Sequence, residues 1–244
     1  MRERIVLDVQ SVSKHFDGLR AVDQLSFTVR EHEVLGLIGP NGSGKTTMMN
    51  LISGSFKPTL GDIYLDDRLI SGRPAREIAR FGVARTFQLV RVLPSLSVLE
   101  NVMAGAVFGR KQLWGREARK YAERQLERVG LAEAAKLPVS ALTYIDEKRV
   151  ELARALASDP EILLLDEWLA GLNPTELQTG IALIRSLRDD GRTVVLVEHV
   201  MDAIRSLCDR CVVMNSGQKI AEGTPEEALS DPQVVRAYLG VDDA

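Results

Sequence analysis

A glycine-rich loop that joins an apolar run to a helix-forming segment constrains this chain more than any other feature. The run Val34–Ile38 is typical of a buried parallel strand, and the sequence GPNGSGKTT follows it directly. The loop fits the pattern G-x-x-x-x-G-K-[ST], whose glycines let backbone N–H groups point inward at phosphate while the lysine reaches the β- and γ-phosphates. We therefore predict a nucleotide phosphate site formed by Gly39, Asn41, Gly42, Ser43, Gly44, Lys45, Thr46 and Thr47, with the Thr46 hydroxyl as a Mg²⁺ ligand.

Two acidic residues follow a second apolar run. Asp166 and Glu167 come directly after Ile162–Leu165, and the carboxyl ends of parallel strands are where α/β proteins bind their ligands. Together with the phosphate loop, the pattern predicts that Asp166 holds Mg²⁺ and that Glu167 polarises an attacking water. By itself, a buried strand with two acids at its exit is common, and this is the competing interpretation.

A third apolar run, TVVLVE, ends at Glu198 and is followed by His199. A neutral imidazole at this strand end could contact the γ-phosphate and the water. A lone histidine at a strand end is more often structural, so His199 alone does not predict a function.

The remaining pattern predicts an α/β fold with an inserted helical block. From about Leu99 to Ser158 there are no strong strand signals, Glu117–Val129 is rich in helix formers, and Thr143 begins a further helix with a capping-box spacing. Partial apolar alternation predicts an antiparallel β piece near the start of the chain. The expected strands are 5–9, 25–29 and 61–65, and the expected helices outside the block are 46–52, 76–80 and 175–188.

Composition narrows the possible partners. The chain has 31 Lys and Arg against 34 Asp and Glu, a net charge of −3, which argues against a nucleic-acid partner. No apolar run reaches the roughly 18–20 residues that cross a bilayer, and the start lacks a secretory signal. We therefore expect a soluble, cytosolic chain.

The two cysteines form a single C-x-x-C pair. A zinc site needs about four ligands, and the chain offers only three histidines besides Cys208 and Cys211. Because Cys211 opens the strand-like run CVVM, the redox arrangement of strand followed by helix does not fit either. Small buried thiols are the favoured interpretation.

In this order and spacing, the elements resemble the ATP-binding subunits of ABC transporters, and the resemblance covers essentially the whole chain. It implies that Lys45 and Asp166 belong to the two Walker motifs of a P-loop ATPase that uses ATP and Mg²⁺. It also implies that Glu167 is the catalytic carboxylate and His199 the switch histidine.

Further residues take roles from the same resemblance. Gln88, in RTFQ, matches the Q-loop glutamine that contacts the metal and γ-phosphate and joins the core to the helical block. Phe16 matches the aromatic residue that stacks on adenine, and Gly171–Asn173 resembles a D-loop. The implied division is one ATP-binding domain, with residues 1–88 and 159–244 as the α/β core and β piece and residues 89–158 as the helical subdomain.

A finer resemblance points to importers of branched-chain amino acids. The motifs RTFQ, LAGLNP, VEHVM and VVRAYLG carry it. It implies import of such amino acids or similar small polar solutes through separate permease subunits. The implied partners also include a second ATP-binding subunit, in a homodimer or heterodimer, and a solute-binding protein, with the chain on the cytoplasmic face of the inner membrane. The apolar stretch 93–98 is either the permease-docking surface or a loop packed on its own helical block.

Two departures from the family pattern stand out. The family signature, usually close to LSGGQ, corresponds to Leu142–Asp146 in this sequence. Thr143 keeps a hydroxyl that could reach a γ-phosphate across a dimer. Ile145 replaces a glycine, and Asp146 replaces a glutamine. We expect these two residues to weaken the partner's ATP site, because a carboxylate opposes an incoming phosphate. The second departure is Trp168, which replaces a proline. The favoured interpretation is that this large apolar side chain serves packing, and the alternative is that it changes the access of water to Glu167.

Other functions share the phosphate loop. A GTPase would carry an N-K-x-D segment, which the sequence lacks, and nothing suggests the acceptor site of a nucleotide kinase. A soluble ABC-type ATPase outside transport tends to have two cassettes or a long coiled coil. A weakly active regulatory cassette is mildly favoured by Ile145 and Asp146 and opposed by the intact Lys45, Asp166, Glu167 and His199.

Overall fold

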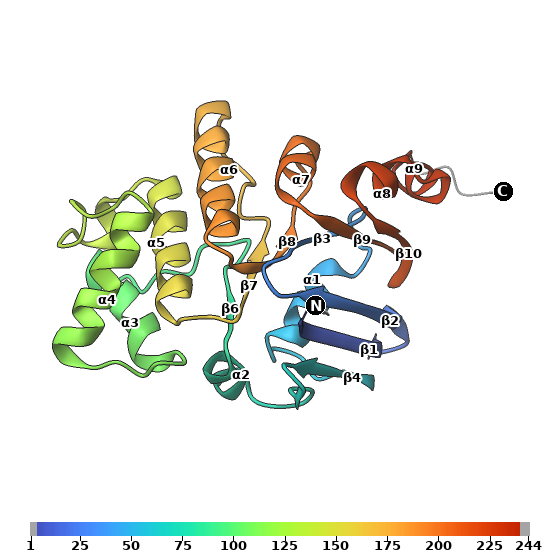
Figure 1. Ribbon diagram of the computed structural model, residues 1–244, viewed down its shortest axis with the longest axis horizontal. Coiled ribbons are helices and arrows are strands. Elements are labelled where there is room, and N and C mark those ends of the chain that lie inside the picture. Colours follow the sequence, from blue (N-terminus) through green and yellow to red (C-terminus); the bar gives the residue numbers. More distant parts are fainter. Residues whose placement is uncertain (1–3, 240–244) are drawn as a thin grey trace.

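The computed structural model describes residues 4–239, which form two β-sheets with helices packed on them (Figure 1). The strands are β1 (Ile5–Phe16), β2 (Leu19–Arg30), β3 (Val34–Ile38), β4 (Leu60–Leu65), β5 (Arg68–Leu69), β6 (Val83–Arg85), β7 (Ile162–Asp166), β8 (Thr193–Val197), β9 (Arg210–Asn215) and β10 (Gln218–Gly223). The helices are α1 (Lys45–Ile52), α2 (Ala75–Phe81), α3 (Val98–Phe108), α4 (Gly115–Arg128), the 3₁₀ turn η1 (Val139–Ala141), α5 (Tyr144–Ala157), α6 (Pro174–Asp189), α7 (Met201–Leu207), α8 (Pro225–Ser230) and α9 (Pro232–Leu239). Gly240 of the VVRAYLG motif and the outermost ends of the predicted segments 1–88 and 159–244 lie outside the described residues.

The central sheet has the strand order β10-β9-β3-β8-β7-β6. All its neighbouring pairs are parallel except β10 with β9. The strands β3, β7 and β8 are buried at every residue, which confirms the strands predicted from apolar runs. Because these strands are parallel, their carboxyl ends bring the phosphate loop, Glu167 and the segment after β8 to one edge.

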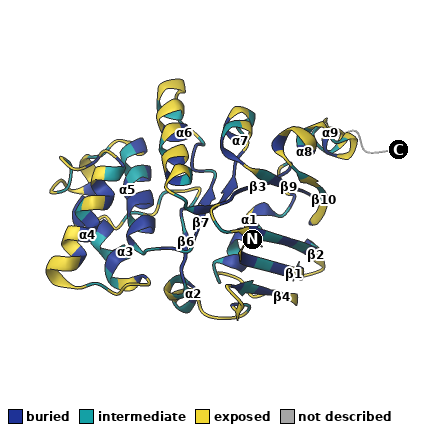
Figure 2. Cartoon of the chain, viewed as in Figure 1, coloured by how far each residue is buried: buried dark blue, intermediate teal, exposed yellow. Residues whose placement is uncertain are grey.

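Alternate residues of the central sheet enter two different apolar cores. On β3, Val34 and Ile38 belong to the core shared with α3 to α7, whereas Leu35 and Leu37 belong to the core shared with α1 and the antiparallel sheet. Figure 2 shows the central strands in dark blue and exposed residues in yellow along the outer helices, such as α4 and α6. The sheet is therefore a rigid platform that is buried on both sides.

The antiparallel sheet has the order β2-β1-β4-β5. The predicted strands 5–9, 25–29 and 61–65 are confirmed, but β1 and β2 are longer than expected, with 12 residues each. Irregular pairing explains the difference, because register shifts interrupt the β1–β2 ladder on both sides of Val12 and break the apolar alternation. Buried side chains fill these breaks, as where Ser13 accepts a hydrogen bond from the backbone N–H of Gln24.

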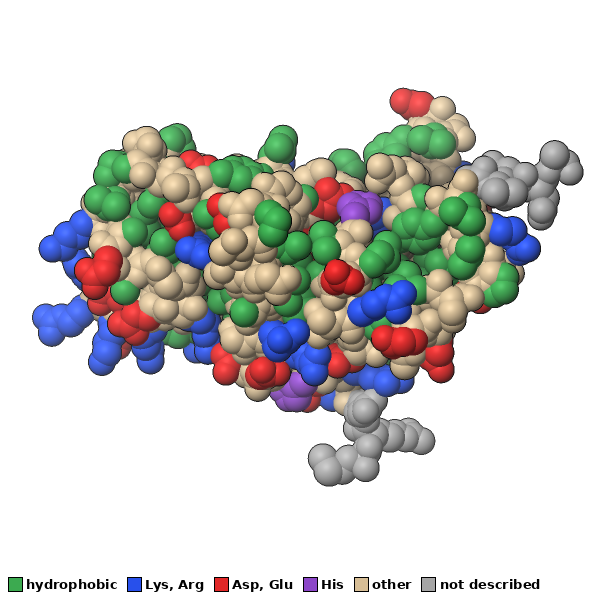
Figure 3. All heavy atoms as spheres, turned by 90° about the horizontal axis from the view of Figure 1, so that it is seen from above, with side chains coloured by type: hydrophobic (Ala, Val, Ile, Leu, Met, Phe, Trp, Pro, Cys, Tyr) green, Lys and Arg blue, Asp and Glu red, His purple; other side chains and the backbone are tan. Residues whose placement is uncertain are grey.

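The helices α3, α4 and α5 pack together at one end of the molecule. The sequence predicted α4 and α5 but not α3. Residues 98–108 are mostly apolar and include a glycine, so they show little amphipathic contrast; a capping box between Ser97 and Glu100 starts the helix. Figure 3 shows Lys and Arg side chains, with acidic ones between them, over this helical end.

The apolar stretch before α3 is held against its own helix. Asn101 accepts a hydrogen bond from the N–H of Leu93 at 2.7 Å and donates to the carbonyls of Leu93 and Ser97, both at 3.0 Å. Val98 is fully buried, whereas Leu93 is 42% exposed. The exposed apolar surface of the predicted docking stretch 93–98 is therefore largest near its beginning.

The two cysteines are free and buried, as the sequence predicted. A Cβ placed on Gly36 would lie 2.9 Å from the sulfur of Cys211 and 3.0 Å from that of Cys208, so the thiols pack directly on β3. Within residues 4–239, no helix is long and apolar enough to cross a membrane.

Candidate functional site

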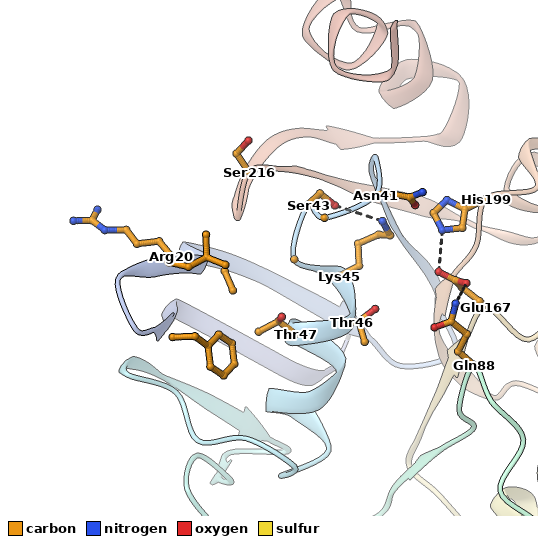
Figure 4. A pocket seen from close by; sticks show the side chains of 15 residues that line it. Arg20, Asn41, Ser43, Lys45, Thr46, Thr47, Gln88, Glu167, His199 and Ser216 are labelled. Carbon is orange, nitrogen blue, oxygen red and sulfur yellow. Dashed lines mark hydrogen bonds and ion pairs between the residues drawn. The ribbon is translucent and has the colours of Figure 1, made fainter. Parts of the chain in front are cut away.

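A cavity of about 1030 Å³ opens at the edge where the parallel strands end. Figure 4 shows side chains from the phosphate loop, the β1–β2 turn and the ends of the central strands facing it. Most of the predicted site residues line this cavity: Phe16, Asn41, Gly42, Ser43, Gly44, Lys45, Thr46, Thr47, Gln88, Glu167 and His199. Gly39, Asp166 and Thr143 do not line it.

The phosphate loop depends on glycine at two tightly packed positions. Gly39 has φ 148° and a Cβ there would lie 2.1 Å from the carbonyl oxygen of Met214. Gly44 has φ 103° and precedes α1, where a Cβ would lie 2.3 Å from the carbonyl oxygen of Ala21. A side chain at either position would push the loop off the strands that support it.

Lys45 is buried at the first residue of α1, with its ammonium folded back over the loop. Its Nζ atom donates to the carbonyls of Gly39 at 2.8 Å and Pro40 at 2.9 Å. Burial lowers the pKa of Lys45, and the negative charges of Glu167 and Asp166 oppose that shift. The ammonium is therefore held by the carbonyls of the phosphate loop itself.

Asp166 ends β7 and is buried behind the cavity. Its Oδ2 atom lies 2.6 Å from Nη2 of Arg85, and both side chains are almost fully buried. Arg85 also donates to Asn50 at 2.7 Å and Ser53 at 3.0 Å, which fixes the guanidinium against α1. The sequence did not predict this role of Arg85, because the contact depends on the pairing of β6 with β7 across a long segment.

Glu167, Gln88 and His199 converge from three separate segments (Figure 4). Nε2 of His199 lies 2.9 Å from Oε1 of Glu167, and Nε2 of Gln88 donates to Oε2 at 2.7 Å. Glu167 has φ 49°, an unusual conformation for a residue with a side chain. Its N–H donates to the carbonyl of Val197, so the strand beside it supports this conformation.

An aromatic pair lies at the opposite end of the cavity. Phe16 is 36% exposed and meets Phe56 edge to face, with ring centroids 5.3 Å apart. The ammonium of Lys14 lies 4.9 Å from the Phe16 ring centre. Arg20 lines the cavity from the start of β2, and Phe56 supports Phe16 from outside the cavity lining. Neither was predicted as a site residue, since only the fold brings them to this end of the cavity.

Thr143 lies at the N-cap of α5, outside the cavity. Its hydroxyl donates to Oδ2 of Asp146 at 2.7 Å, and Oδ1 of Asp146 pairs with Arg149 at 3.0 Å. Ile145 is helical and nearly buried, so the backbone at this position has no left-handed turn that would need glycine.

Trp168 is 1% exposed and packs in the core, as the favoured interpretation predicted. Glu198, next to His199, is also buried, and its Oε1 accepts a hydrogen bond from the N–H of Leu169 at 2.7 Å. Burial raises the pKa of Glu198 to about 7.

Comparisons with known proteins agree with this arrangement. The family profile described as "ABC transporter" matches residues 22–170, and that described as "Branched-chain amino acid ATP-binding cassette transporter" matches residues 218–244. The chain is 42% identical over 252 residues to the high-affinity branched-chain amino acid transport ATP-binding protein LivG of Salmonella typhimurium, covering 96% of this chain and 98% of that protein. It is 41% identical to the corresponding protein BraF of Pseudomonas aeruginosa, covering 97% and 98%.

Solved structures share the fold. The ADP conformation of MJ1267, an ATP-binding cassette of an ABC transporter, superposes with a TM-score of 0.87 at 31% identity, covering 97% of this chain and 99% of that chain. A dimeric, post-hydrolysis structure of the cassette MJ0796 with ADP and phosphate superposes with a TM-score of 0.80 at 29% identity, covering 90% and 98%. These similarities and the two sheets confirm the predicted fold class: an α/β P-loop core with an antiparallel β piece and inserted helices.

Proposed function

Because the chain belongs to the ABC transporter family of ATP-binding subunits, we propose that its ATP hydrolysis drives import of branched-chain amino acids or similar small polar solutes. The observation that carries the proposal is the convergence of Gln88, Glu167 and His199 beside the phosphate loop. The choice of solute is supported by the names of LivG and BraF and by the match at residues 218–244.

The phosphates of ATP would bind the loop and the start of α1. Backbone N–H groups of the loop and the positive end of the helix favour an anion here. Lys45 would exchange the carbonyls of Gly39 and Pro40 for β- and γ-phosphate oxygens. Asn41, Ser43 and Thr47 would complete the contacts around the phosphates.

The exposed face of Phe16 suits the adenine ring. Its edge-to-face contact with Phe56 holds the ring in place, and stacking on aromatic rings is a common way to bind a flat base. Phe16 lies in the same cavity as the phosphate loop, so one nucleotide would contact both.

The oxygen donors around the loop fit Mg²⁺, which takes one or two carboxylates together with phosphates and waters. Thr46 lines the cavity beside the loop, and Gln88 keeps its carbonyl oxygen after its amide binds Glu167. Asp166 has one oxygen engaged by Arg85, so we assign its metal contact to the other oxygen or to a bridging water. Bound there, Mg²⁺ would neutralise charge on the β- and γ-phosphates.

Glu167 would act as general base in the reaction of ATP and water to ADP and phosphate. Its carboxylate would accept the proton of the attacking water, while the hydrogen bonds from His199 and Gln88 hold it toward the γ-phosphate. Removing one of these donors would let the carboxylate rotate away from the water.

We further propose the assembly that the family implies. A second ATP-binding subunit would close on this one, so that Thr143 and the D-loop Gly171–Asn173 face the partner's nucleotide. Residues 89–158 would form a helical subdomain beside a core of 1–88 and 159–244. This subdomain would contact permease subunits near Leu93. A solute-binding protein would deliver the cargo, and the chain would lie on the cytoplasmic face of the inner membrane.

The test combines hydrolysis with transport. The purified chain is expected to release phosphate from Mg²⁺-ATP, and Glu167→Gln should slow this by about 100-fold or more while ATP still binds. In cells lacking the native gene, uptake of labelled leucine should return with the wild-type chain but not with Glu167→Gln. Near-normal hydrolysis by Glu167→Gln would overturn the mechanism, and rescued uptake of urea but not of leucine would exclude branched-chain amino acids as the cargo.

A further inference from the structure

A lysine in α5 is buried with backbone carbonyls, rather than an ion-pair partner, at its ammonium. Lys148 is only 1% exposed, and among residues 4–239 no acidic oxygen lies within ion-pair distance of its ammonium. Three backbone carbonyls take its place, those of Trp168 at 2.8 Å, Ala170 at 3.0 Å and Glu167 at 3.5 Å. An ammonium has three N–H donors, so these carbonyls match its full hydrogen-bonding capacity.

The contact is reciprocal. The indole N–H of Trp168 donates to the carbonyl of Lys148 at 3.2 Å, so each residue binds the backbone of the other. The indole is also wedged against α6, because a Cβ on Gly180 would lie 3.2 Å from its Cζ3 atom. We call this pair of contacts the Lys148–Trp168 clasp.

The clasp holds the turn that follows Glu167. In that turn the N–H of Ala170 donates to the carbonyl of Glu167, and the N–H of Leu169 donates to Glu198. The N–H of Glu167 itself donates to Val197. The N–H groups of Glu167 and Leu169 are therefore fixed by β8 and its end. The carbonyls of Glu167, Trp168 and Ala170 are fixed by Lys148.

We propose that Lys148 is a positioning residue for ATP hydrolysis. By fixing the carbonyls of the turn 167–170, it maintains the strained backbone of Glu167 and so directs that carboxylate toward His199 and the phosphate loop. This inference rests on the proposed function, because it needs Glu167 as the general base.

The same contact links two parts of the catalytic machinery. Lys148 lies about one helical turn after Thr143 at the start of α5, and α5 carries the signature residues that would face a partner's nucleotide. A shift of α5 would therefore pull on the turn behind Glu167. The clasp thus connects the signature of this chain to the general base of the same chain.

A purely structural role predicts different behaviour from a positioning role. Burying a charged group is costly, so Lys148 could be replaced without kinetic consequence if it only filled space. If it positions Glu167, its loss should lower kcat and leave ATP affinity unchanged, because the phosphate loop is held by other contacts. It should also have no effect once the carboxylate of Glu167 is gone.

The experiment uses Lys148→Met in the full chain, with exposed Lys120→Met as the matched control. Phosphate release at saturating Mg²⁺-ATP, ATP affinity from a fluorescent nucleotide analogue, and the unfolding midpoint are measured for each. We expect kcat to fall about tenfold or more for Lys148→Met with an unchanged Kd, since small displacements of a catalytic group cost this much. Lys120→Met should match the wild type.

Two further variants separate positioning from folding. In a Glu167→Gln background, Lys148→Met should cause no additional loss of the residual rate, and Lys148→Arg, which keeps a cation, should retain most wild-type turnover. If Lys148→Met does not fold, Trp168→Phe removes the indole donor and part of the ring but keeps the Lys148 ammonium, and it should still lower kcat at constant Kd.

Several outcomes would overturn the inference. The first is a wild-type kcat in Lys148→Met or, where that variant does not fold, in Trp168→Phe. The second is a loss of ATP affinity that parallels the loss of turnover in the same variant. The third is that Lys148→Met lowers the residual rate of Glu167→Gln by the same factor as it lowers the wild-type rate. A wild-type chain without Glu167-dependent hydrolysis would instead refute the proposed function.

Discussion

Nε2 of Gln88 lies 2.7 Å from Oε2 of Glu167, although 79 residues separate the two positions. Gln88 follows β6 at the entrance to the helical end, and Glu167 follows β7 in the central sheet. The hydrogen bond therefore joins the segment that leads to α3 with the proposed general base.

Gln88→Ala should lower ATP turnover by about tenfold, the effect of losing one hydrogen bond to a charged group. The loss should be smaller than that of Glu167→Gln, because the carboxylate remains. Steady-state phosphate release checks this, with Gln178→Ala on the exposed face of α6 as control. Equal rates for the two alanine variants would show that Gln88 does not orient Glu167.

Arg85→Met should lower the free energy of unfolding by about 3–5 kcal/mol, because it leaves the buried carboxylate of Asp166 without its cation. Arg119→Met breaks an exposed ion pair with Glu123 and should cost less than about 1 kcal/mol. Urea unfolding of both variants gives the comparison. Similar small losses in the two would contradict the structural importance of Arg85.

Asp146→Gln should raise turnover of the assembled dimer, by up to about tenfold, since it removes a negative charge and releases the Thr143 hydroxyl for phosphate. Glu147→Gln, which removes the neighbouring charge from the same helix, is the control. The measurement is ATP hydrolysis with the membrane subunits present. An unchanged rate and affinity would mean that the carboxylate of Asp146 attenuates no site.

Glu198→Gln should stabilise the chain at high pH. Burial raises the pKa of Glu198 to about 7, so the contribution of its protonated form is complete below about pH 4.5 and is lost as the pH rises through 7. The variant should match the wild type near pH 4.5 and exceed it by up to about 3 kcal/mol at pH 8.5, while its amide oxygen still accepts from Leu169. A difference between the two proteins that does not change with pH, measured by denaturant unfolding, would refute this.

Leu93→Asp should weaken co-purification with permease subunits, because Leu93 presents the exposed part of the stretch before α3. Leu69→Asp is a matched control, since Leu69 is also 42% exposed but lies on β5 at the edge of the antiparallel sheet. Equal recovery of membrane subunits with both variants would favour the alternative of a loop that only packs on its own helices.

Local signals explain what the sequence predicted well. The phosphate loop, the apolar strands β3, β7 and β8, and the cap of α5 at Thr143 are each determined by a few neighbouring residues. Where a pattern depended on distant partners, prediction failed. The helix α3 lacks the amphipathic contrast that marks a helix, because it packs against both α4 and α5. Its remaining local signal in the sequence is the capping box at Ser97.

The candidate site divides in the same way. Motif spacing predicted Lys45 and Glu167, and the family resemblance implied Gln88 and His199. All four residues line one cavity. Arg85 and Lys148 were missed, although both hold the acidic residues in place. Their partners are set by strand pairing and helix packing, and no short motif encodes a lysine that binds three carbonyls of a distant turn.

The burial of the two thiols against Gly36 has a practical consequence for measuring conformational changes of this protein. The thiolate is the form that attacks a thiol reagent, and the hydrogen bond to Cys211 together with burial raises the pKa of Cys208. Because both thiols are buried, reagents have little access to either native cysteine, and both should resist labelling. A single cysteine introduced at an exposed site such as Trp114, in the helical layer, would then carry a fluorophore or spin label selectively in the otherwise unmodified chain. Movements of that layer during the ATP cycle become measurable without first building a cysteine-free protein.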